Sequence, residues 1–251
     1  MKFTKMHGLG NDFVVLDDEV EVTSDLVRAM CDRHFGVGAD GLLTIGVSDG
    51  LITMGYWNAD GSPAEMCGNG LRCIARLAVD RGLASPGRFE VRTPAGHKRV
   101  EVGSEIRVDL GVPTVGDMIE LDARYFRTVD VGNPHLVTDV DDVAGAPVES
   151  VGRAIQGVYP GGANVEFVRI SGPDVEMRVW ERGVGETLAC GSGIVAAAAI
   201  ARRNGGGDRI SVTMPGGTAR VEIEDGGAWL VGPAEYVFEG QWDSRGVRPN
   251  S

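Results

Sequence analysis

Residues 58–76 read NADGSPAEMCGNGLRCIAR and place a cysteine, Cys67, at the start of an expected helix. Apolar residues from Leu71 onward recur at helical spacing, Arg72 and Arg76 lie on another face, and Gly82 is expected to end the helix. Free N–H groups and the helix dipole at a helix start favour negative charge, which lowers a thiol's pKa below its usual ~8.5. The stretch therefore predicts a thiol that acts as a base or nucleophile, and the alternative is a buried structural cysteine.

The same pattern occurs a second time. Residues 177–201, MRVWERGVGETLACGSGIVAAAAIA, align with 54–78, MGYWNADGSPAEMCGNGLRCIARLA, so that Cys190 falls on Cys67 at an offset of 123 (190 minus 67). Two further blocks repeat in order: GNDFVV at 10–15 with GNPHLV at 132–137, and GAD at 38–40 with GAN at 162–164. The sequence therefore predicts a duplicated unit with one cysteine at a helix start in each copy.

The repeat predicts an α/β (α+β) fold of two pseudo-symmetric domains. In each domain we expect a curved mixed or antiparallel sheet wrapped around a central helix, with the active site in the cleft between the domains. The helix at 193–201 is apolar all round, so it should be buried on every side. The expected boundaries are 1–115 for the repeat with Cys67, 118–238 for the repeat with Cys190 and 239–251 for a C-terminal tail, with a linker at 113–117.

Hydrophobic periodicity predicts the remaining elements. A helix is expected at 23–34 with Ser24 as its N-cap, and a short helix within 141–157. Expected strands lie at 51–57, 88–93, 97–102, 106–110, 128–131, 210–214, 218–224 and 228–231.

Composition excludes several classes of protein. The net charge of −12 and the pI near 4.8 speak against nucleic-acid binding, which needs a basic patch. The N-terminal residues lack the apolar core of a signal peptide, and the apolar run at 194–201 is far shorter than the ~20 residues that span a bilayer. We therefore expect a cytoplasmic protein with no membrane partner.

The four cysteines, Cys31, Cys67, Cys73 and Cys190, form no CxxC pair, and the four histidines stand apart in sequence. A cytoplasmic chain is normally kept reduced, so we expect neither disulfides nor a metal site. Cys31 and Cys73 are expected to pack within helices.

Two helix-start thiols in duplicated halves suit the removal of a proton from one face of a carbon and its delivery to the other face. Such chemistry inverts a stereocentre without a cofactor when one thiolate and one thiol are present at the working pH. The substrate would be a carbon acid such as an α-amino acid. Its carboxylate would lie between two helix N-termini, whose N–H groups stabilise the developing charge. Those N–H groups belong to Gly68, Asn69, Gly191 and Ser192.

The chain resembles the diaminopimelate epimerases. The resemblance lies in KMHGLGNDFVVLD, GVGADG, NADGSPAEMCGNGLRC, VGNPH, ANVEFV and WERGVGETLACGSG, followed by MPGG and GPA, which span nearly the whole chain. It implies interconversion of LL- and meso-diaminopimelate in lysine and peptidoglycan-precursor synthesis. It also implies a cofactor-independent two-cysteine mechanism, two domains that close over the substrate, and a homodimer.

The resemblance also implies a role for individual residues. Cys67 and Cys190 would be the acid/base pair, with His135 and Glu181 beside the reacting centre to set the thiol pKa values. The residues implied to bind substrate are Asn11, Asn58, Gly68, Asn69, Asn133, Asn164, Glu181, Arg182, Gly191 and Ser192. One position departs from the family: many members carry Gln after GAD, whereas this chain has Gly41, so that side-chain contact would be lost or supplied by water.

Two alternatives stay open. A proline racemase-like enzyme would share the two-cysteine plan but bind a smaller substrate, whereas Asn58, Asn164 and Arg182 favour a longer one with a second polar end. A thiol redox or zinc-binding protein would use Cys67 and Cys190 as a switch.

Overall fold

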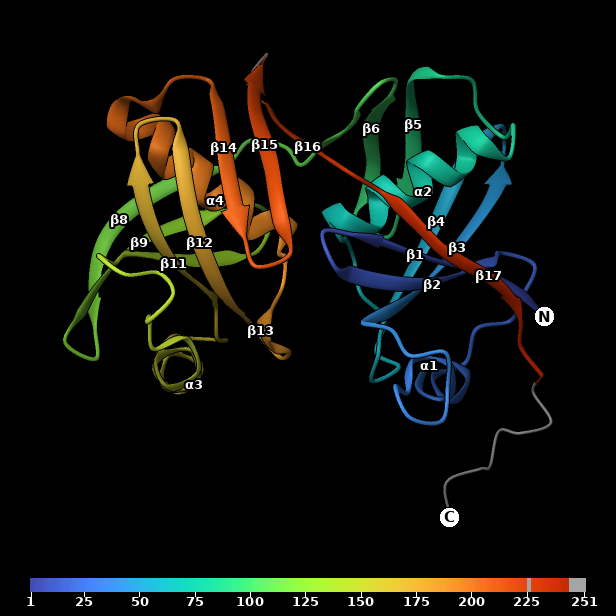
Figure 1. The fold of residues 1–251 in the computed structure, drawn as a ribbon, viewed down its shortest axis with the longest axis horizontal. Coiled ribbons are helices and arrows are strands. Elements are labelled where there is room, and N and C mark those ends of the chain that lie inside the picture. The colour runs from blue at the N-terminus through green and yellow to red at the C-terminus, as the bar shows by residue number, and fades with distance from the viewer. Residues whose placement is uncertain (225–226, 244–251) are drawn as a thin grey trace. The chain divides into compact units, whose positions relative to one another are not determined.

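The computed structural model describes residues 1–224 and 227–243 (Figure 1). In this part of the chain, 17 strands accompany four α-helices, which confirms the expected mixed α/β fold. The chain divides into two compact units. The first unit contains Met1–Val108 together with the residues from Pro233 onward, and the second contains Asp109–Gly232.

The first unit is a mixed sheet with two helices. Neighbouring strands follow the order β17, β1, β2, β3, β4, β5, β6 and β7; the pairs β2–β3 and β4–β5 are parallel and the others are antiparallel. The helices are α1 (Ser24–Cys31) and α2 (Gly68–Asp80). The strands are β1 (Lys2–Gly8), β2 (Asn11–Asp17), β3 (Gly41–Ser48), β4 (Leu51–Asn58), β5 (Gly87–Thr93), β6 (Gly96–Val102), β7 (Ile106–Asp109) and β17 (Glu235–Gln241).

The second unit repeats this plan. Its strands follow the order β8, β9, β10, β11, β12, β14, β15 and β16, with β10–β11 and β12–β14 parallel and the other pairs antiparallel; β13 pairs with β12. Its helices are α3 (Val148–Val158) and α4 (Gly191–Ala201), and a π-helical turn (Arg202–Gly206) follows α4. The strands are β8 (Thr114–Leu121), β9 (Arg124–Asp130), β10 (Pro134–Asp139), β11 (Asn164–Ser171), β12 (Asp174–Glu181), β13 (Gly185–Thr187), β14 (Arg209–Met214), β15 (Gly217–Glu224) and β16 (Gly227–Gly232).

The matched strand orders of the two units agree with the internal duplication. The unit boundaries differ from those expected from the sequence in the placement of one strand, β17. β8 pairs with β9 in the second unit as β17 pairs with β1 in the first, so the last strand of the chain completes the first unit. The sequence boundaries instead assign residues up to 238 to the second copy and begin the tail at 239, which lies within β17. The expected linker at 113–117 is largely occupied by β8. From residue 244 onward, the expected tail lies outside the described residues.

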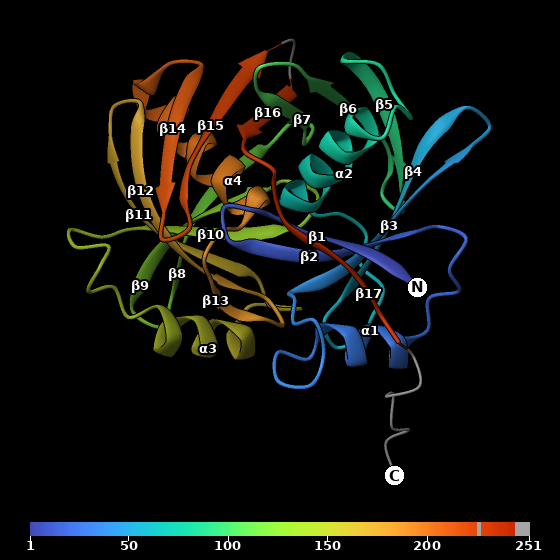
Figure 2. The ribbon, with the colours of Figure 1, turned by 45° about the vertical axis from the view of Figure 1, so that its right-hand side comes forward.

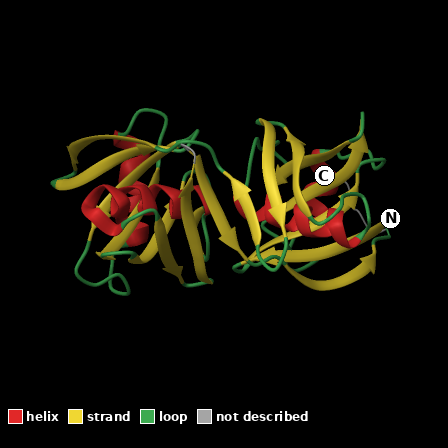
Figure 3. Ribbon diagram, turned by 90° about the horizontal axis from the view of Figure 1, so that it is seen from above, coloured by secondary structure: helices red, strands yellow, loops and turns green. Residues whose placement is uncertain are grey.

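Each unit holds one helix against its sheet (Figures 1 and 2). All but one residue of α4 are buried, as its apolar sequence predicts, and the helix packs on β10, β11 and β12 and on β14, β15 and β16. In the first unit, α2 packs on β1 and β6, and its residues Leu71, Ile74 and Leu77 are almost fully buried. Figure 3 shows strands on several sides of the helices. The central helix predicted for each unit is therefore confirmed, and each one begins next to a cysteine.

Helix ends follow local chemistry, with one correction. The N-cap of α1 is Thr23, whose Oγ1 accepts a hydrogen bond from the Leu26 N–H at 3.2 Å. Ser24, the expected cap, instead donates its hydroxyl to the Gly61 carbonyl at 2.9 Å. Gly82 follows α2 with φ of 70°, the left-handed conformation that ends helices, as the sequence predicts. Among the described helices, none has the length and apolar character needed to cross a membrane.

Candidate active site

Both cysteines of the repeat are N-cap residues of their unit's central helix. Cys67 has φ −143° and ψ 118°, and Cys190 has φ −121° and ψ 112°, the extended backbone typical of an N-cap. The Cys67 sulfur accepts the Gly70 N–H at 3.5 Å, and the Cys190 sulfur accepts the Gly193 N–H at 3.4 Å. Each sulfur thus occupies the position that a serine oxygen takes in an ordinary cap, next to the positive end of a helix dipole.

In the first unit, Cys67 adjoins the turn between β1 and β2. The Cys67 thiol lies 3.5 Å from Oδ1 of Asn11, which also accepts the side-chain N–H of Asn69 at 3.1 Å. The amide nitrogen of Asn11 donates to Oδ2 of Asp40 at 2.9 Å. Because both ends of the Asn11 amide are engaged, its oxygen is held toward the thiol. Three residues predicted for the site, Cys67, Asn11 and Asn69, are therefore joined.

A charged cluster lies behind this turn. Asp12 forms ion pairs with Lys5 at 2.6 Å and with Arg33 at 2.8 Å, and Arg33 also reaches Asp40 at 2.6 Å. Burial raises the pKa of Asp12, but hydrogen bonds from Arg33 and Lys5 outweigh it and lower that pKa to about 2. The cluster thus combines two cations and two carboxylates. Through Arg33 it holds Asp40, the carboxylate that orients Asn11.

Arg72 belongs to the N-terminal part of α2 and is fully buried. Its Nη2 donates to Oδ1 of Asn69 at 2.8 Å and its Nε to the Pro233 carbonyl at 3.1 Å. Burial lowers the pKa of Arg72 to about 10, so the guanidinium stays charged at neutral pH. The sequence placed Arg72 with Arg76 on a polar face, but only Arg76 is partly exposed, at 43% of its side chain. The expectation of a polar face at Arg72 is wrong. It followed the rule that charged side chains are almost always exposed to solvent, and Arg72 is an exception to that rule.

Asn58 and Gly41 lie on adjacent strands. The side-chain hydrogen bond of Asn58 goes to its own turn, not to Cys67, Asn11 or Asn69. The Asn58 side chain donates to Oγ of Ser62 at 3.1 Å, within its own turn. Gly41 is paired with Asn58 in the β3–β4 register. A Cβ on Gly41 would lie 2.7 Å from the Trp57 carbonyl and 2.9 Å from the Tyr56 ring. This backbone therefore has no room for the glutamine common in the family, and Tyr56 fills the space beside Gly41.

In the second unit, Cys190 is buried and surrounded by acidic groups. Burial, followed by the charges of Glu181 and Glu166, raises the pKa of the Cys190 thiol well above its usual value. The helix start and the Ser192 hydroxyl, 3.6 Å from the sulfur, act in the opposite direction and are outweighed. At Cys190, burial and the acidic neighbours therefore outweigh the helix start, and the sequence pattern shows neither of them.

Glu181 lies at the end of β12, and its pKa is raised by burial. Hydrogen bonds from Thr187 and Cys190 act against this rise. A carboxyl group that takes up protons more readily than usual, next to a thiol that gives them up less readily, can share a proton with that thiol.

His135, at the start of β10, is held by three polar groups. Its Nδ1 lies 2.6 Å from Oε1 of Glu166, while its Nε2 lies 3.0 Å from Oδ1 of Asn133 and 3.4 Å from Nδ2 of Asn164. Nδ1 therefore lies against the Glu166 carboxylate, and Nε2 faces the amides of Asn133 and Asn164. His135, Asn133 and Asn164 are therefore brought together.

The Asn164 side chain also binds the Arg182 backbone. Oδ1 of Asn164 accepts the Arg182 N–H at 2.9 Å. The Arg182 side chain is exposed and donates to the Gly161 carbonyl at 3.4 Å. Arg182 is thus free to change partners when an anion approaches, because it gives up a single long hydrogen bond to a carbonyl.

Two buried charged residues, Glu166 and Arg72, were missed as site residues. Glu166 on β11 is fully buried, and its Oε2 has no hydrogen-bond partner within the described residues. The available signal was a lone carboxylate in the apolar run of ANVEFV, since buried acids are rare unless paired. Arg72 gave a weaker signal, because an arginine one turn before Arg76 is typical of a solvated helix face.

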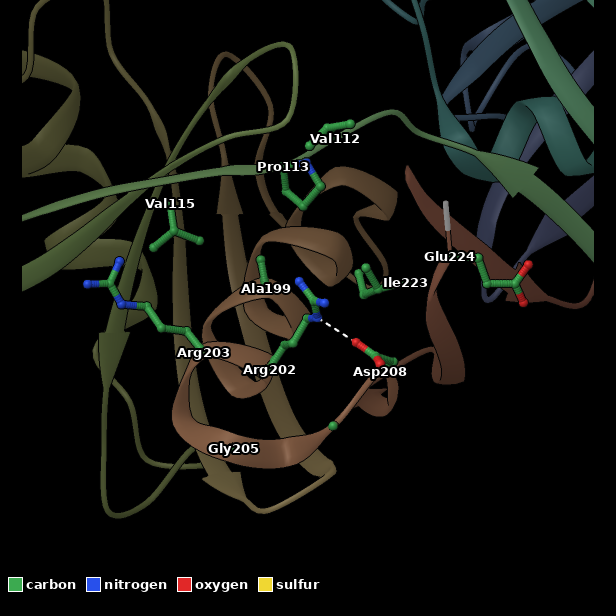
Figure 4. Close-up of a pocket in the computed structure, with 11 residues that line it drawn as sticks. Val112, Pro113, Val115, Ala199, Arg202, Arg203, Gly205, Asp208, Ile223 and Glu224 are labelled. Atoms are coloured by element: carbon green, nitrogen blue, oxygen red, sulfur yellow. Dashed lines mark hydrogen bonds and ion pairs between the residues drawn. The ribbon is translucent and has the colours of Figure 1, made fainter. Parts of the chain in front are cut away.

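One cavity of the second unit does not include Cys190 in its lining. A cavity of about 760 Å³ at the C-terminal end of α4 is lined by Pro113, Ala199, Arg202 and Asp208, with Arg202 donating to Asp208 (Figure 4). None of the predicted site residues lines it. Within the described residues, no group of three or more His, Cys, Asp or Glu side chains is arranged to hold a metal ion.

The charges around Cys67 differ from those around Cys190. Cys67 lies near a buried cation, whereas Cys190 lies among carboxylates. An opposite charge favours the ionised form of a group and a like charge disfavours it. The two cysteines therefore lie in opposite electrostatic surroundings.

Comparisons with known proteins match most of the chain. The family model for diaminopimelate epimerase matches residues 3–115 and 127–237. An O-ureido-serine racemase of Streptomyces lavendulae is 44% identical, over 96% of this chain and 94% of the relative. A diaminopimelate epimerase of Pelotomaculum thermopropionicum is 39% identical, over 98% of this chain and 100% of the relative.

Solved structures agree on the fold at low sequence identity. A PhzF-family phenazine biosynthesis protein of Enterococcus faecalis superposes with a TM-score of 0.77 at 12% identity, over 95% of this chain and 97% of its own. A probable proline racemase of Agrobacterium radiobacter superposes with a TM-score of 0.75 at 14% identity, over 97% of this chain and 93% of its own. The two-domain fold predicted from the sequence is thereby confirmed.

Proposed function

We propose that this chain, which belongs to the diaminopimelate epimerase family, inverts the α-carbon of LL-diaminopimelate to give meso-diaminopimelate. One observation supports the proposal above the others. Each unit places a cysteine at the N-cap of its central helix, and the two cysteines have opposite electrostatic surroundings. A two-base inversion needs that difference, because one thiol must be ionised while the other is protonated.

In the proposed mechanism, Cys67 as thiolate removes the α-proton of the LL substrate and Cys190 as thiol delivers a proton to the opposite face. Atoms balance without a cofactor, since one proton leaves the carbon and one arrives. The charge that develops on the substrate carboxylate would be stabilised by N–H groups at both helix starts, from Gly68, Asn69, Gly191 and Ser192. His135 and Glu181 would regulate the protonation of Cys190.

The distal end of the substrate would be held by polar residues on loops and strand ends. Arg182 is suited to a carboxylate, because its exposed guanidinium offers paired N–H donors. Asn11, Asn58, Asn133 and Asn164 would bind the remaining polar groups. The proposal includes a cytoplasmic location and a homodimer, and sedimentation of the purified chain would test the dimer.

A second candidate is the racemisation of O-ureido-serine. The 44% identity to an O-ureido-serine racemase, against 39% to a diaminopimelate epimerase, favours it. Both compounds are α-amino acids, but a ureido group is neutral, whereas the far end of diaminopimelate carries an ammonium and a carboxylate. The two candidates therefore share the cysteines and differ in their need for Arg182.

A substrate comparison tests the proposal. Purified, reduced enzyme is incubated with LL-diaminopimelate, O-ureido-L-serine or L-proline, and each product enantiomer or epimer is measured by chiral chromatography. The proposal expects the largest kcat/KM for LL-diaminopimelate, and none in a Cys190→Ala variant. A larger kcat/KM for O-ureido-L-serine establishes the second candidate, and preference for L-proline indicates a proline racemase-like enzyme. If none of the three substrates is converted and the reduced protein contains stoichiometric zinc, the zinc-binding alternative is supported.

A further inference from the structure

We propose that Arg72 is a positioning residue whose buried positive charge holds Cys67 in its thiolate form, ready to remove a proton. The inference rests on the proposed function, in which Cys67 is the base. Arg72 would touch neither substrate nor the reacting carbon. It would act through its charge, which its hydrogen bond to Asn69 holds at the N-terminal end of the helix that Cys67 caps.

The charge of Arg72 is not neutralised by a carboxylate among its hydrogen-bond partners. It donates to the amide oxygen of Asn69 and to the Pro233 carbonyl, both of which are neutral. Its Nη1 is buried with no hydrogen-bond partner within the described residues. Burial of a guanidinium in such a place is unfavourable, because the ion loses its solvation. Replacing buried ionic groups by hydrophobic residues of similar volume is often neutral or stabilising, so packing alone does not account for an arginine here.

The backbone makes room for the guanidinium. A Cβ on Gly8 would lie 2.9 Å from Nη2 of Arg72 and 3.3 Å from Cβ of Asn69. Gly8 has no positive φ, so its turn does not require glycine. The absence of a side chain at residue 8 is therefore explained by the space that Arg72 and Asn69 occupy.

The other charges around Cys67 largely compensate one another. Lys5 and Arg33 balance Asp12 and Asp40, which lie beyond Asn11, and His7 lies 3.7 Å from the carboxylate of Glu235. Cys73, on the same helix, remains a neutral thiol because burial raises its pKa to about 12. Glu65 precedes Cys67 by two positions on an exposed loop, where water screens its charge. Among the described residues of this helix, Arg72 is a buried charge without a carboxylate among its hydrogen-bond partners, and it interacts electrostatically with Cys67.

Asn69 transmits the position of Arg72 to the site. Because Nη2 of Arg72 donates to its oxygen, Asn69 must turn its amide nitrogen to Oδ1 of Asn11. Asn11 therefore presents an oxygen that accepts the Cys67 S–H, a contact that favours the protonated thiol. The thiolate is favoured instead by the helix start, through the Gly70 N–H, and by the Arg72 charge.

The test measures how pH controls alkylation of Cys67, without any substrate. Wild type and variants are treated with iodoacetamide from about pH 5 to about pH 10, where thiolate formation governs the rate. The Cys67-containing peptide is then quantified by mass spectrometry. Arg72→Met and Arg72→Gln remove the charge, Arg72→Lys keeps it, and Arg76→Met is the matched control on the next turn of the helix. Thermal unfolding is recorded for every variant.

We expect the midpoint for Cys67 to move about one pH unit or more to the alkaline side in Arg72→Met and Arg72→Gln, the size of effect that a nearby opposite charge produces. Arg72→Lys and Arg76→Met should stay near wild type. An unchanged midpoint in a folded neutral variant overturns the proposal. So does failure of all three Arg72 variants to fold, which would assign the residue to folding instead.

The alkylation result for Cys67 does not depend on which substrate the enzyme uses. If LL-diaminopimelate is not turned over but the midpoint shifts, the proposed function fails and the role of Arg72 stands. If LL-diaminopimelate is turned over and Arg72→Met leaves both the midpoint and the pH profile of kcat/KM unchanged, the proposed function stands and the role of Arg72 fails.

Discussion

His135 and Glu166 form a fully buried pair, with Nδ1 of the imidazole 2.6 Å from Oε1 of the carboxylate. The pair lies in the second unit, where Glu166 also contributes to the raised pKa of Cys190. No carboxylate accepts a hydrogen bond from Arg72 in the described part of the first unit. The duplicated units thus keep the same cysteine position and differ in the charges placed around it.

Glu181→Gln should make Cys190 easier to ionise. The carboxylate of Glu181 is, after burial, the largest cause of the raised pKa of Cys190, so its removal should lower that pKa. Alkylation of Cys190 followed by mass spectrometry should then begin at a lower pH than in wild type. Glu186→Gln, an exposed carboxylate that pairs with Arg178, is the control. An identical alkylation profile in wild type and Glu181→Gln would show that Glu181 does not act on Cys190.

Arg182→Lys should reduce kcat/KM for LL-diaminopimelate by about tenfold or more, because lysine keeps the charge but loses the paired geometry of a guanidinium. The loss should be absent for O-ureido-L-serine, whose far end is neutral. Arg153→Lys, an exposed residue paired with Glu149, should leave both substrates unaffected. Equal losses for the two substrates would mean that Arg182 does not bind a distal carboxylate.

Asp12→Asn should destabilise the protein at neutral pH and have little effect in acid. The pKa of Asp12 is lowered to about 2 in the folded state, from a reference value of 3.8, so its stabilising contribution is complete above pH 4 and is lost as pH falls toward 2. The contribution is about 2 kcal/mol by linkage. Urea unfolding at about pH 6 and pH 2.5 measures it, and the difference between wild type and variant should shrink in acid. Asp25→Asn, in an exposed pair with Arg28, is the control. A pH-independent difference would contradict the assignment.

Gly152→Ala should be strongly destabilising, because a Cβ there would lie 2.2 Å from Cγ of Trp180. The clash would displace the residue before Glu181, so activity should fall with stability. Gly157→Ala lies in the same helix with no atom within 4 Å of its Cβ, and should be neutral or more stable by up to about 1 kcal/mol. Thermal unfolding separates the two, and equal melting temperatures would contradict the packing described at Trp180.

The sequence predicted the features that are local or repeated. Cys67 and Cys190 were assigned to helix starts from the spacing around them, and the structure places both at N-caps. The apolar sequence of α4 likewise predicted its burial. These inferences worked because capping and periodicity depend on neighbours within one or two turns.

Features that depend on distant parts of the chain were not predicted. Strand β17 completes the first unit by pairing with β1, more than 200 residues earlier in the chain. No local pattern shows which partner a strand will take. Arg72 and Glu166 read as ordinary polar residues, because only the packed structure shows that Gly8 leaves room for one and that His135 pairs with the other.

The most direct test of the two-base mechanism is the incorporation of solvent deuterium during early turnover. Enzyme and LL-diaminopimelate are mixed in deuterated water, and the α-hydrogen of product and of remaining substrate is measured by mass spectrometry before equilibrium. Because Cys67 takes a proton from one face and Cys190 gives another from the opposite face, each product molecule should carry solvent deuterium at the inverted carbon. Recovered substrate should stay largely protiated. Early transfer of the substrate's own hydrogen into product would show a single base acting on both faces, and would contradict the separate roles of Cys67 and Cys190.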